Sequence, residues 1–429
     1  MLEFKLSEMK EEYLHYLFRF KLLGNQFKTV DGKKLEILNF GTYNTNAGPD
    51  FLEGKIKLNE EVWSGPIEFH VKSSDWLLHK HQLDKRYDNV IAHFVFEHDV
   101  EVKSGSYNLP TIELKSKIDF GHYSKYAVLA ESKKIIPCQS QIMEVDPFMI
   151  YQQKERALTN RIFRKSQIIL QDIHRLNGDT EKAFYLSLAR TFGGKVNSIP
   201  FEKLIELSDL KKLQKWKEDK YAIVAMLFGV AGLLPLLSTD DYVNELKTEF
   251  NFQKHKLKLK ELNASEWKYS RMYAHGFPPI RLAQFSELIR KKIPLSKLIS
   301  GEMTMKKIMS LFDVTPHEFW ETHYRFETST KLKSTKFSKD FKSLLFINAI
   351  VPFLFAIGVL NDDESLKVKA LNYLNELEPE KNSVIQSWTN LGIKSETAFD
   401  TQALIEQKNE FCSKKKCLFC TVGTKLLRA

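Results

Sequence analysis

The sequence contains few of the residues that mark several classes of protein: its 429 residues include only four cysteines, 13 prolines and 18 glycines. These numbers exclude a disulfide scaffold, a collagen-like repeat and a disordered chain rich in proline and glycine. The N-terminus has no apolar segment followed by a small-residue cleavage site, so we expect no secretory signal. Together with the few cysteines, this predicts a reducing, cytoplasmic environment.

Long hydrophobic runs are also scarce. Two uncharged runs, residues 221–237 and 344–360, are shorter than the roughly 20 apolar residues that span a bilayer. Each contains proline and glycine, so we interpret both as buried helices and expect no membrane contact. The 64 Lys and Arg exceed the 54 Asp and Glu, which gives a net charge of +10. This surplus favours a polyanionic partner such as nucleic acid, although charge alone decides little.

The first 120 residues combine helical and alternating hydrophobic patterns. Residues 6–23 place apolar side chains at helical spacing, and Ser7 can cap the start of that helix. After Lys33, short runs with alternating or β-branched residues predict strands, separated by one helical segment. The expected elements are strands at 33–40, 51–58 and 62–72, a helix at 74–87, a strand at 89–97, and a hairpin of 100–107 with 108–115.

After about residue 119, long stretches rich in Leu, Lys, Glu and Phe predict helices. We therefore expect an α+β protein, in which a mixed-sheet core is followed by a large, mainly helical domain. No repeat of fixed period is present, which excludes a solenoid. The predicted parts are a core at 1–120, a connector bearing Cys138 at 121–145, a helical domain at 146–410 and a C-terminal cysteine segment at 411–429.

Acidic and basic side chains gather on two of the predicted strands. Asp50 precedes one strand, and Glu68, His70 and Lys72 are spaced two apart along the next. Side chains two apart in a strand share a face, and Asp50 on the neighbouring strand can join them. Two carboxylates on adjacent strands suit Mg²⁺ or Mn²⁺, which can activate water for attack on a phosphodiester. A nearby lysine or histidine can then stabilise charge or transfer a proton.

The Pro-Asp pair, the gap to Glu68 and the order of elements resemble the PD-(D/E)xK nuclease core. This resemblance implies that Asp50 and Glu68 bind metal, and that His70 occupies the usual lysine position with Lys72 one pleat further. It also implies an acid on the first helix, for which Glu12 is the candidate. Glu68 differs from the other E-x-K sequences by its distance from Asp50 and by the surrounding elements. Those other sequences begin at Glu53, Glu101 and Glu113.

A histidine-rich segment follows the strand that carries Glu68. It contains His79, His81 and, on the next strand, His93. These imidazoles could form a transition-metal centre with Glu68 and His70. However, no zinc motif is present, and positions 79 and 81 do not share a face of a helix. We therefore favour His93 as a packed strand residue, and His79 and His81 as surface or nucleic-acid contacts.

Three cysteines near the C-terminus form a C-x4-C-x2-C cluster: Cys412, Cys417 and Cys420. The remaining cysteine, Cys138, can supply a fourth thiolate. Four thiolates suit tetrahedral zinc or a [4Fe-4S] cluster, and the lysines at 414–416 would offset part of their charge. The arrangement resembles the iron-sulfur-stapled branch of the same nuclease superfamily, except that Cys138 follows the catalytic motifs. The alternative is four unrelated reduced thiols.

Several basic segments are candidates for contact with a phosphate backbone. Arginine side chains can grip phosphates, and neighbouring aromatic rings can stack on bases. The spacing alone favours solvated faces, so only the coexistence with Asp50 and Glu68 supports nucleic acid. The predicted nucleic-acid contacts, besides the two histidines, are Arg161, Arg164, Arg271, Arg281, Lys333 and Lys336.

Over nearly its full length the chain resembles a bacterial family known as domain of unknown function 2851. The segments NAGPDF, LFGVAGLL, FPPIRLAQFSEL and CSKKKCLFCTVG carry this resemblance, together with the segment from Ile67 to Val95. The family supplies no activity. The residues themselves favour a metal-dependent DNA or RNA nuclease with a four-cysteine metal site. The alternative is a non-catalytic nucleic-acid-binding or scaffold protein with a degenerate nuclease fold.

Overall fold

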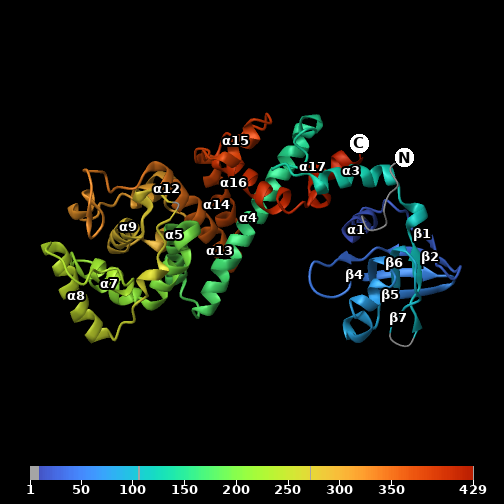
Figure 1. Cartoon of the computed structure of the whole chain (residues 1–429), viewed down its shortest axis with the longest axis horizontal. Helices are drawn as coiled ribbons and strands as arrows, with labels where there is room; N and C mark the ends of the chain where they lie inside the picture. The colour runs from blue at the N-terminus through green and yellow to red at the C-terminus, as the bar shows by residue number, and fades with distance from the viewer. Residues whose placement is uncertain (1–8, 105–106, 271, 429) are drawn as a thin grey trace. The chain divides into compact units, whose positions relative to one another are not determined.

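The structure is a computed structural model that describes residues 9–104, 107–270 and 272–428. It forms two compact units (Figure 1): unit 1 comprises Met1–Ile150 and Glu410–Ala429, and unit 2 comprises Tyr151–Asn409. Unit 1 thus joins the predicted core, the connector and the C-terminal cysteine segment. Unit 2 corresponds to the predicted helical domain without its ends. The expected α+β class is confirmed, with a mixed sheet followed by a helical region.

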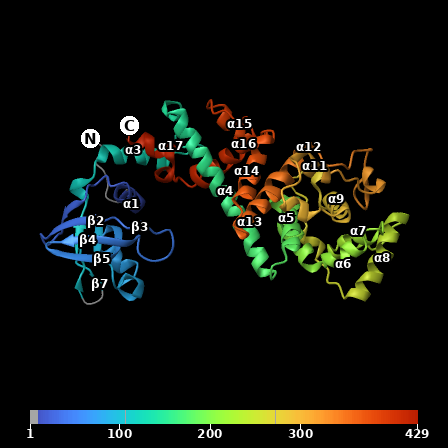
Figure 2. The ribbon, with the colours of Figure 1, turned by 180° about the vertical axis from the view of Figure 1, so that it is seen from behind.

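Unit 1 is built on a mixed sheet whose strand order is β1-β2-β4-β5-β6-β9, with β3 paired to β4. Figure 2 shows its strands β2, β3, β4 and β5. The strands from β1 to β5 pair antiparallel, whereas β5, β6 and β9 pair parallel. The bounds are β1 (Gln26–Lys28), β2 (Lys34–Asn39), β3 (Thr42–Tyr43), β4 (Phe51–Leu58), β5 (Glu61–Lys72), β6 (Ala92–Glu97) and β9 (Thr111–Glu113).

Helix α1 (Glu11–Arg19) covers one face of this sheet. Its buried residues, Tyr13 and Phe18 among them, join Phe51, Phe69 and Phe94 of three strands in one core. The helix lies inside the predicted span of 6–23, and the predicted cap Ser7 falls outside the described residues. Unit 1 also contains the helices α3 (Phe120–Glu131) and α17 (Thr421–Arg428).

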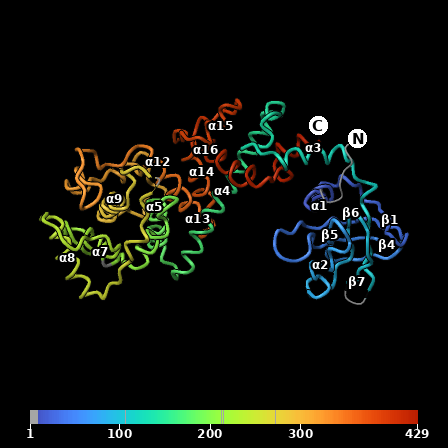
Figure 3. Tube along the Cα trace, viewed as in Figure 1, coloured from blue at the N-terminus to red at the C-terminus, as the bar shows by residue number. Residues whose placement is uncertain are grey.

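The opposite face carries an irregular segment where a helix was predicted. Helix α2 (Asp75–Leu78) has only four residues, and two 3₁₀ turns follow it at His81–Leu83 and Lys85–Tyr87. In Figure 3 this segment lies beside β5, away from α1. Trp76 and Tyr87 anchor it in a small cluster of their own. The predicted helix at 74–87 is therefore wrong for most of its length.

The predicted hairpin is also shorter than expected. Strand β7 (Lys103–Ser104) pairs with β8 (Tyr107–Asn108), but β9 leaves the hairpin and joins the main sheet beside β6. Pro110 separates β8 from β9, and proline cannot donate a hydrogen bond within a strand ladder. The main sheet therefore gains a strand that the sequence pattern assigned elsewhere.

Unit 2 consists almost entirely of helices, with one small hairpin of β10 (His323–Arg325) and β11 (Thr328–Ser329). The first helix, α4, begins in unit 1 and continues into unit 2. The helices are α4 (Pro147–Arg175), α5 (Thr180–Leu207), α6 (Leu210–Lys215), α7 (Ala222–Val230), α8 (Asp241–Leu257), α9 (Pro278–Lys291), α10 (Leu295–Ile299), α11 (Met305–Leu311), α12 (Lys339–Leu345), α13 (Val351–Leu360), α14 (Glu364–Glu376), α15 (Ser383–Thr389) and α16 (Ala398–Glu406).

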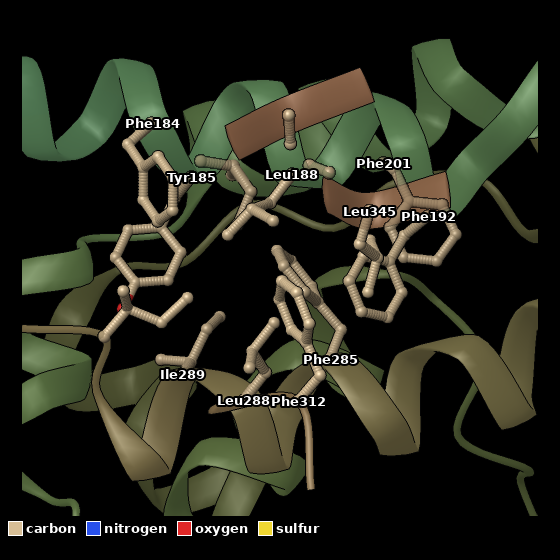
Figure 4. Packing of buried hydrophobic residues seen from close by; sticks show 14 of the residues in the cluster. Phe184, Tyr185, Leu188, Phe192, Phe201, Phe285, Leu288, Ile289, Phe312 and Leu345 are labelled. Carbon is tan, nitrogen blue, oxygen red and sulfur yellow. The ribbon is translucent and has the colours of Figure 1, made fainter. Parts of the chain in front are cut away.

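Aromatic and aliphatic side chains fill the interior of unit 2. Figure 4 shows Phe184 and Phe192 of α5 facing Phe285 and Leu288 of α9. One helical stretch, Lys339–Leu360, is long and apolar enough to cross a membrane, but 67% of its apolar window is buried within the structure. Residues 222–230 are likewise all buried, in α7. The second apolar run thus occurs as core helix for most of its length, and the first does so only at residues 222–230, since Leu236 and Leu237 at its end are exposed.

Glycine allows two helices of unit 2 to approach closely. A Cβ atom placed on Gly229 of α7 would lie 2.1 Å from the ring of Phe250 on α8, and that ring is only 5% exposed. No side chain other than hydrogen fits at this contact, because a packed core has little room to shift. Gly276, by contrast, has no neighbouring atom within 4 Å of such a Cβ.

We therefore expect Gly229→Ala to lower the free energy of unfolding of unit 2 by roughly 1–3 kcal/mol, as overpacking does. Gly276→Ala serves as the matched control and should leave stability nearly unchanged. Urea denaturation followed by circular dichroism measures both. Equal stability of the two variants would contradict the close packing of α7 on α8.

Candidate functional site

Strand β5 places Glu68 and His70 on the face of the sheet opposite α1. Side chains alternate along a strand, so Phe69 packs on Phe18 of α1, with 5.0 Å between the ring centroids, while its two neighbours point away. Glu68 and His70 are 5% and 1% exposed. Lys72 is exposed at the end of the same face. The predicted lysine therefore lies toward solvent, whereas a carboxylate and an imidazole are buried together.

Two backbone hydrogen bonds hold Asp50 beside Glu68. The Asp50 N–H donates to Glu68 Oε2 over 3.0 Å, and the Phe69 N–H donates to Asp50 Oδ2 over 3.0 Å. The pairing of β4 with β5, which sets Phe51 opposite Ile67, fixes this geometry. Burial, and then the adjacent charge of Asp50, raises the pKa of Glu68 well above its usual range. The two carboxylates selected from the sequence thus meet.

Helix α1 brings a histidine and a carboxylate to Asp50. His15 Nε2 lies 3.1 Å from Asp50 Oδ2, and Glu11 Oε1 lies 3.9 Å from the same nitrogen. Burial raises the pKa of Glu11 to about 7, although His15 opposes this change. The structure brings Glu11, not the predicted Glu12, to this group, because one helical residue turns a side chain by about 100°. The i,i+4 spacing of Glu11 and His15 is the signal that identifies them.

Three imidazoles converge on the other side of Glu68. His70 Nε2 lies 3.2 Å from His79 Nδ1. Glu68 Oε1 lies 3.4 Å from His81 Nε2 and 3.8 Å from His70 Nε2. One nitrogen from each of the three histidines lies within 4.8 Å of the other two. These residues therefore form a single group with Glu68.

A break in the helix explains why His79 and His81 meet. Helix α2 ends at Leu78, and Lys80 has a left-handed backbone with φ of 61°. The chain reverses there, and the two flanking histidines both turn toward His70. The expectation that positions 79 and 81 cannot share a face assumed a continuous helix, and it is wrong for that reason.

A second layer of side chains orients these imidazoles. His70 Nδ1 lies 2.8 Å from His93 Nε2, so the other nitrogen of His70 points toward Glu68. His81 stacks on Tyr87 with 3.8 Å between ring centroids, and Trp76 meets its edge. His93 is fully buried on β6, as predicted for a packed strand residue. A histidine whose second nitrogen is engaged in this way is typical of metal ligands.

The buried imidazoles of His70, His81 and His93 are neutral at physiological pH. Burial, and then the neighbouring histidines, lowers the pKa of His70 to about 2, of His93 to about 3 and of His81 to about 4. Neutral imidazole is the form that binds metal. The group therefore combines buried carboxylates, which a cation would stabilise, with nitrogens in the ligating state.

The predicted nucleic-acid contacts of unit 2 have different surroundings. Arg161 and Arg164 of α4 pair with Glu406 and line a cavity. The guanidinium of Arg281 lies 3.4 Å from the centre of the Phe341 ring, and burial lowers its pKa to about 10. The remaining three are Lys333, which donates to the carbonyls of Trp320 and His323, Lys336, which is exposed, and Arg271, which lies outside the described residues.

The four cysteines all belong to unit 1. Cys412, Cys417 and Cys420 are buried, and Cys138 is half-buried. Burial, and then the proximity of Cys420 and Cys417, raises the pKa of Cys138 to about 12. The pKa of Cys417 rises to about 12 by burial and by Cys420. Three of the four thiols therefore lie close enough to affect one another's ionisation.

Of the predicted lysine neighbours, Lys415 is the one whose charge acts on Cys417, where it lowers the pKa of the thiol. The Lys415 side chain also donates to the backbone carbonyl of Ser132, in the segment that leads from α3 to Cys138. Lys414 pairs with Glu410 instead. Lys415 therefore links the C-terminal segment to the connector.

A family model described as protein of unknown function (DUF2851) matches residues 11–383. The chain belongs to this family. The match includes both carboxylates and all the histidines of the site, whereas three of the cysteines lie beyond it. No curated protein and no solved structure matches the chain.

The raised pKa of Glu68 predicts how the stability of the metal-free protein depends on pH. Because the pKa of Glu68 is raised in the folded state, its stabilising effect is present below about pH 4.5 and is lost as the pH rises. We expect Glu68→Gln to raise the free energy of unfolding at pH 8 by at least about 1 kcal/mol, since one pKa unit is about 1.4 kcal/mol. The gain should nearly vanish at pH 4.5.

Urea denaturation in the presence of a chelator, at both pH values, measures this difference. Glu101→Gln is the matched control, because Glu101 is exposed and should show no pH-dependent gain. A destabilised Glu68→Gln variant at pH 8 would contradict the raised pKa.

Proposed function

We propose that the protein is a metal-dependent nuclease, whose metal centre contains Asp50, Glu68 and the imidazoles of His70, His79 and His81. The observation that carries this proposal is the convergence of imidazole nitrogens on the buried carboxylate of Glu68. Glu68 Oε1 lies 3.4 Å from His81 and 3.8 Å from His70. The facing nitrogens of His70 and His79 are 3.2 Å apart. These distances approach the spacing of about 3.3 Å between ligands at the corners of a tetrahedron with 2.0–2.1 Å bonds. A cation bound there would replace the proton that the His70–His79 contact otherwise requires.

The donor set bears on the identity of the ion. Carboxylate oxygens alone suit Mg²⁺ or Mn²⁺, whereas imidazole favours metals such as Zn²⁺ or Fe²⁺. The sequence predicted Mg²⁺ or Mn²⁺ at Asp50 and Glu68 alone. The three histidines argue for Mn²⁺ or Zn²⁺ over Mg²⁺. His79 is exposed, so an ion can enter from solvent on that side.

The residues around Asp50 are suited to move a proton. When bound, a divalent ion would lower the pKa of a water molecule and polarise a phosphoryl oxygen. His15 contacts Asp50, and Tyr43 Oη lies 3.5 Å from the other nitrogen of His15. These contacts engage both ring nitrogens of His15 and hold Asp50 in place, and Glu11 beside His15, with its pKa raised to about 7, can accept a proton from water. Lys72, exposed beyond His70, can neutralise a phosphate of the substrate.

Two features support a nucleic-acid substrate. The net charge of +10 favours a polyanion, and the order of elements around the carboxylates is the one on which the resemblance to the PD-(D/E)xK nucleases rests. In that interpretation α1 precedes the sheet, Asp50 precedes β4 and Glu68 lies on β5. His70 then occupies the usual lysine position, where its neutral imidazole would bind the metal and would not supply a positive charge.

Cleavage of labelled single- and double-stranded DNA and RNA, with and without Mn²⁺ or Zn²⁺, tests the activity. We expect Asp50→Asn and Glu68→Gln each to lower the metal-dependent rate at least about 100-fold, since each removes a carboxylate that binds the ion. Glu101→Gln, from another E-x-K sequence, should cleave like the wild type. Absence of cleavage by the wild type on every substrate would overturn the enzyme proposal.

A metal-binding measurement distinguishes a non-catalytic binding or scaffold protein from a nuclease whose cleavage assay has failed. His79→Ala should lose one equivalent of bound metal and remain folded, because His79 is exposed, whereas His255→Ala on α8 should lose none. A protein that binds metal and nucleic acid but cleaves neither DNA nor RNA would be the scaffold or binding protein that is our second candidate.

We further propose that Cys138, Cys412, Cys417 and Cys420 hold zinc or a [4Fe-4S] cluster. The mutual effect of the thiols of Cys138, Cys417 and Cys420 on their pKa values supports this proposal. A bound metal would stabilise the thiolates that burial otherwise disfavours. The site would then fasten residues 410–429 to the connector within unit 1.

Anaerobic purification followed by elemental analysis and an absorbance spectrum tests the cysteine site. We expect about four iron atoms for one [4Fe-4S] cluster, or one zinc, per chain. Cys420→Ser should lose this metal, whereas Ser413→Ala, in the same segment, should retain it. A wild-type protein whose only metal is lost in His79→Ala would show that the cysteines are unmetallated thiols.

A further inference from the structure

The cavity that Arg161 and Arg164 line in unit 2 has a volume of about 750 Å³ and is separate from the proposed metal centre and the cysteine site. Helices α4 and α5 form one side, and residues 380–384 and 405–409 form the other. Its volume falls within the usual range of small-ligand pockets, about 300–1,000 Å³. The cations that line it are Arg161, Arg164, Lys165, Arg190, Lys195 and Lys408, against the single carboxylate of Glu380.

The arginines of the cavity already have carboxylate partners. Arg161 and Arg164 share Glu406, whose side chain is 2% exposed. Arg190 pairs with Asp172 and with Glu202. These pairs neutralise much of the arginine charge and hold the guanidinium groups in fixed orientations.

The lysines differ from the arginines in this respect. Within the described ranges of the chain, no ion pair joins Lys165, Lys195 or Lys408 to a carboxylate. Lys165 Nζ donates to Asn348 Oδ1 over 2.6 Å, which uses one of the three hydrogens of an ammonium group. Burial, and then the charges of Arg161 and Arg164, lowers the pKa of Lys165 to about 7. The cavity is therefore lined by three lysines that form no ion pair among the described residues, and a bound anion would favour the charged form of Lys165.

We propose that this cavity binds the phosphate monoester of a nucleotide or of a nucleic-acid end, with Lys165, Lys195 and Lys408 as its cationic contacts. A monoester carries close to two negative charges and several acceptor oxygens, so it matches a site with several separate cations. Side chains of Ser198, Asn382 and Ser383 line the same space and supply further polar groups. The remaining volume accommodates the sugar and base attached to the phosphate.

A purely structural role does not account for Lys165. A charged group in a crowded, partly apolar position destabilises the folded state unless a counter-charge accompanies it. Asn348 is neutral, and the nearby carboxylates of Glu406 and Glu380 offset only part of the effect of burial on Lys165. Such a cost is typical of residues retained for binding. We therefore expect Lys165→Met to stabilise the protein and, at the same time, to weaken its affinity for phosphate.

Calorimetric titration of the full chain in EDTA tests the proposal. The probes are inorganic phosphate, a nucleoside monophosphate, and a short oligonucleotide with and without a 5′-phosphate. We expect Lys195→Ala/Lys408→Ala and Lys165→Met each to weaken the monophosphate at least about ten-fold. Lys260→Ala/Lys297→Ala, which changes two exposed lysines elsewhere in unit 2, should bind like the wild type.

Tighter binding of the 5′-phosphorylated strand than of the free nucleotide would identify a strand end as the ligand, and the reverse order would identify a mononucleotide. Failure of every probe at millimolar concentration would overturn the proposal, as would undiminished binding in the lysine variants. The outcome is independent of the metal centre, because the cavity belongs to unit 2. Glu68→Gln should therefore bind phosphate normally even where cleavage is lost.

Discussion

The arrangement of unit 1 depends on two backbone N–H groups that hold two buried carboxylates side by side. The amides of Asp50 and Phe69 each donate to the carboxylate on the neighbouring strand. The register of β4 against β5 therefore fixes the positions of both carboxylates. A slip of one residue would turn Glu68 into the aromatic core beneath α1. The imidazoles then lie on one side of the Asp50 and Glu68 carboxylates, and His15 lies on the other.

Alternating sequence patterns were sufficient to predict most of this sheet and the meeting of Asp50 with Glu68. Period-two spacing specifies which side chains share a face of a strand, and β4 and β5 are long enough to show it. The pattern failed where the backbone leaves regular structure. His79 and His81 converge because Lys80 adopts a left-handed conformation, and lysine gives no sign of this in a sequence. Glu12 was predicted because it lies beside the helix face of Met9 and Tyr16, whereas the packing of α1 on the sheet directs Glu11 toward His15 and Asp50.

The two units deal with buried charge in opposite ways. In unit 2 the carboxylate of Glu406 is almost completely buried but lies between two guanidinium groups, which compensates for the loss of water around it. In unit 1 the neighbours of Glu68 are a second carboxylate and neutral imidazoles, so compensation must come from a proton or a cation. The sequence does not distinguish Glu406 from Glu68, because each is an acidic residue with basic residues or histidines in the same chain. The tertiary structure determines which of those residues contact each carboxylate.

The division of the chain also bears on the order in which the protein is made. Residues 410–429 pack with residues 1–150, although all of unit 2 lies between them. A nascent chain leaves the ribosome with its N-terminus first, and its domains fold as they emerge. Unit 2, which is continuous, is therefore synthesised in full before α17 and three of the four cysteines. Until then the sheet of unit 1 lacks Cys417, Leu418 and Leu427 from its core, which leaves apolar surface available to chaperones during translation.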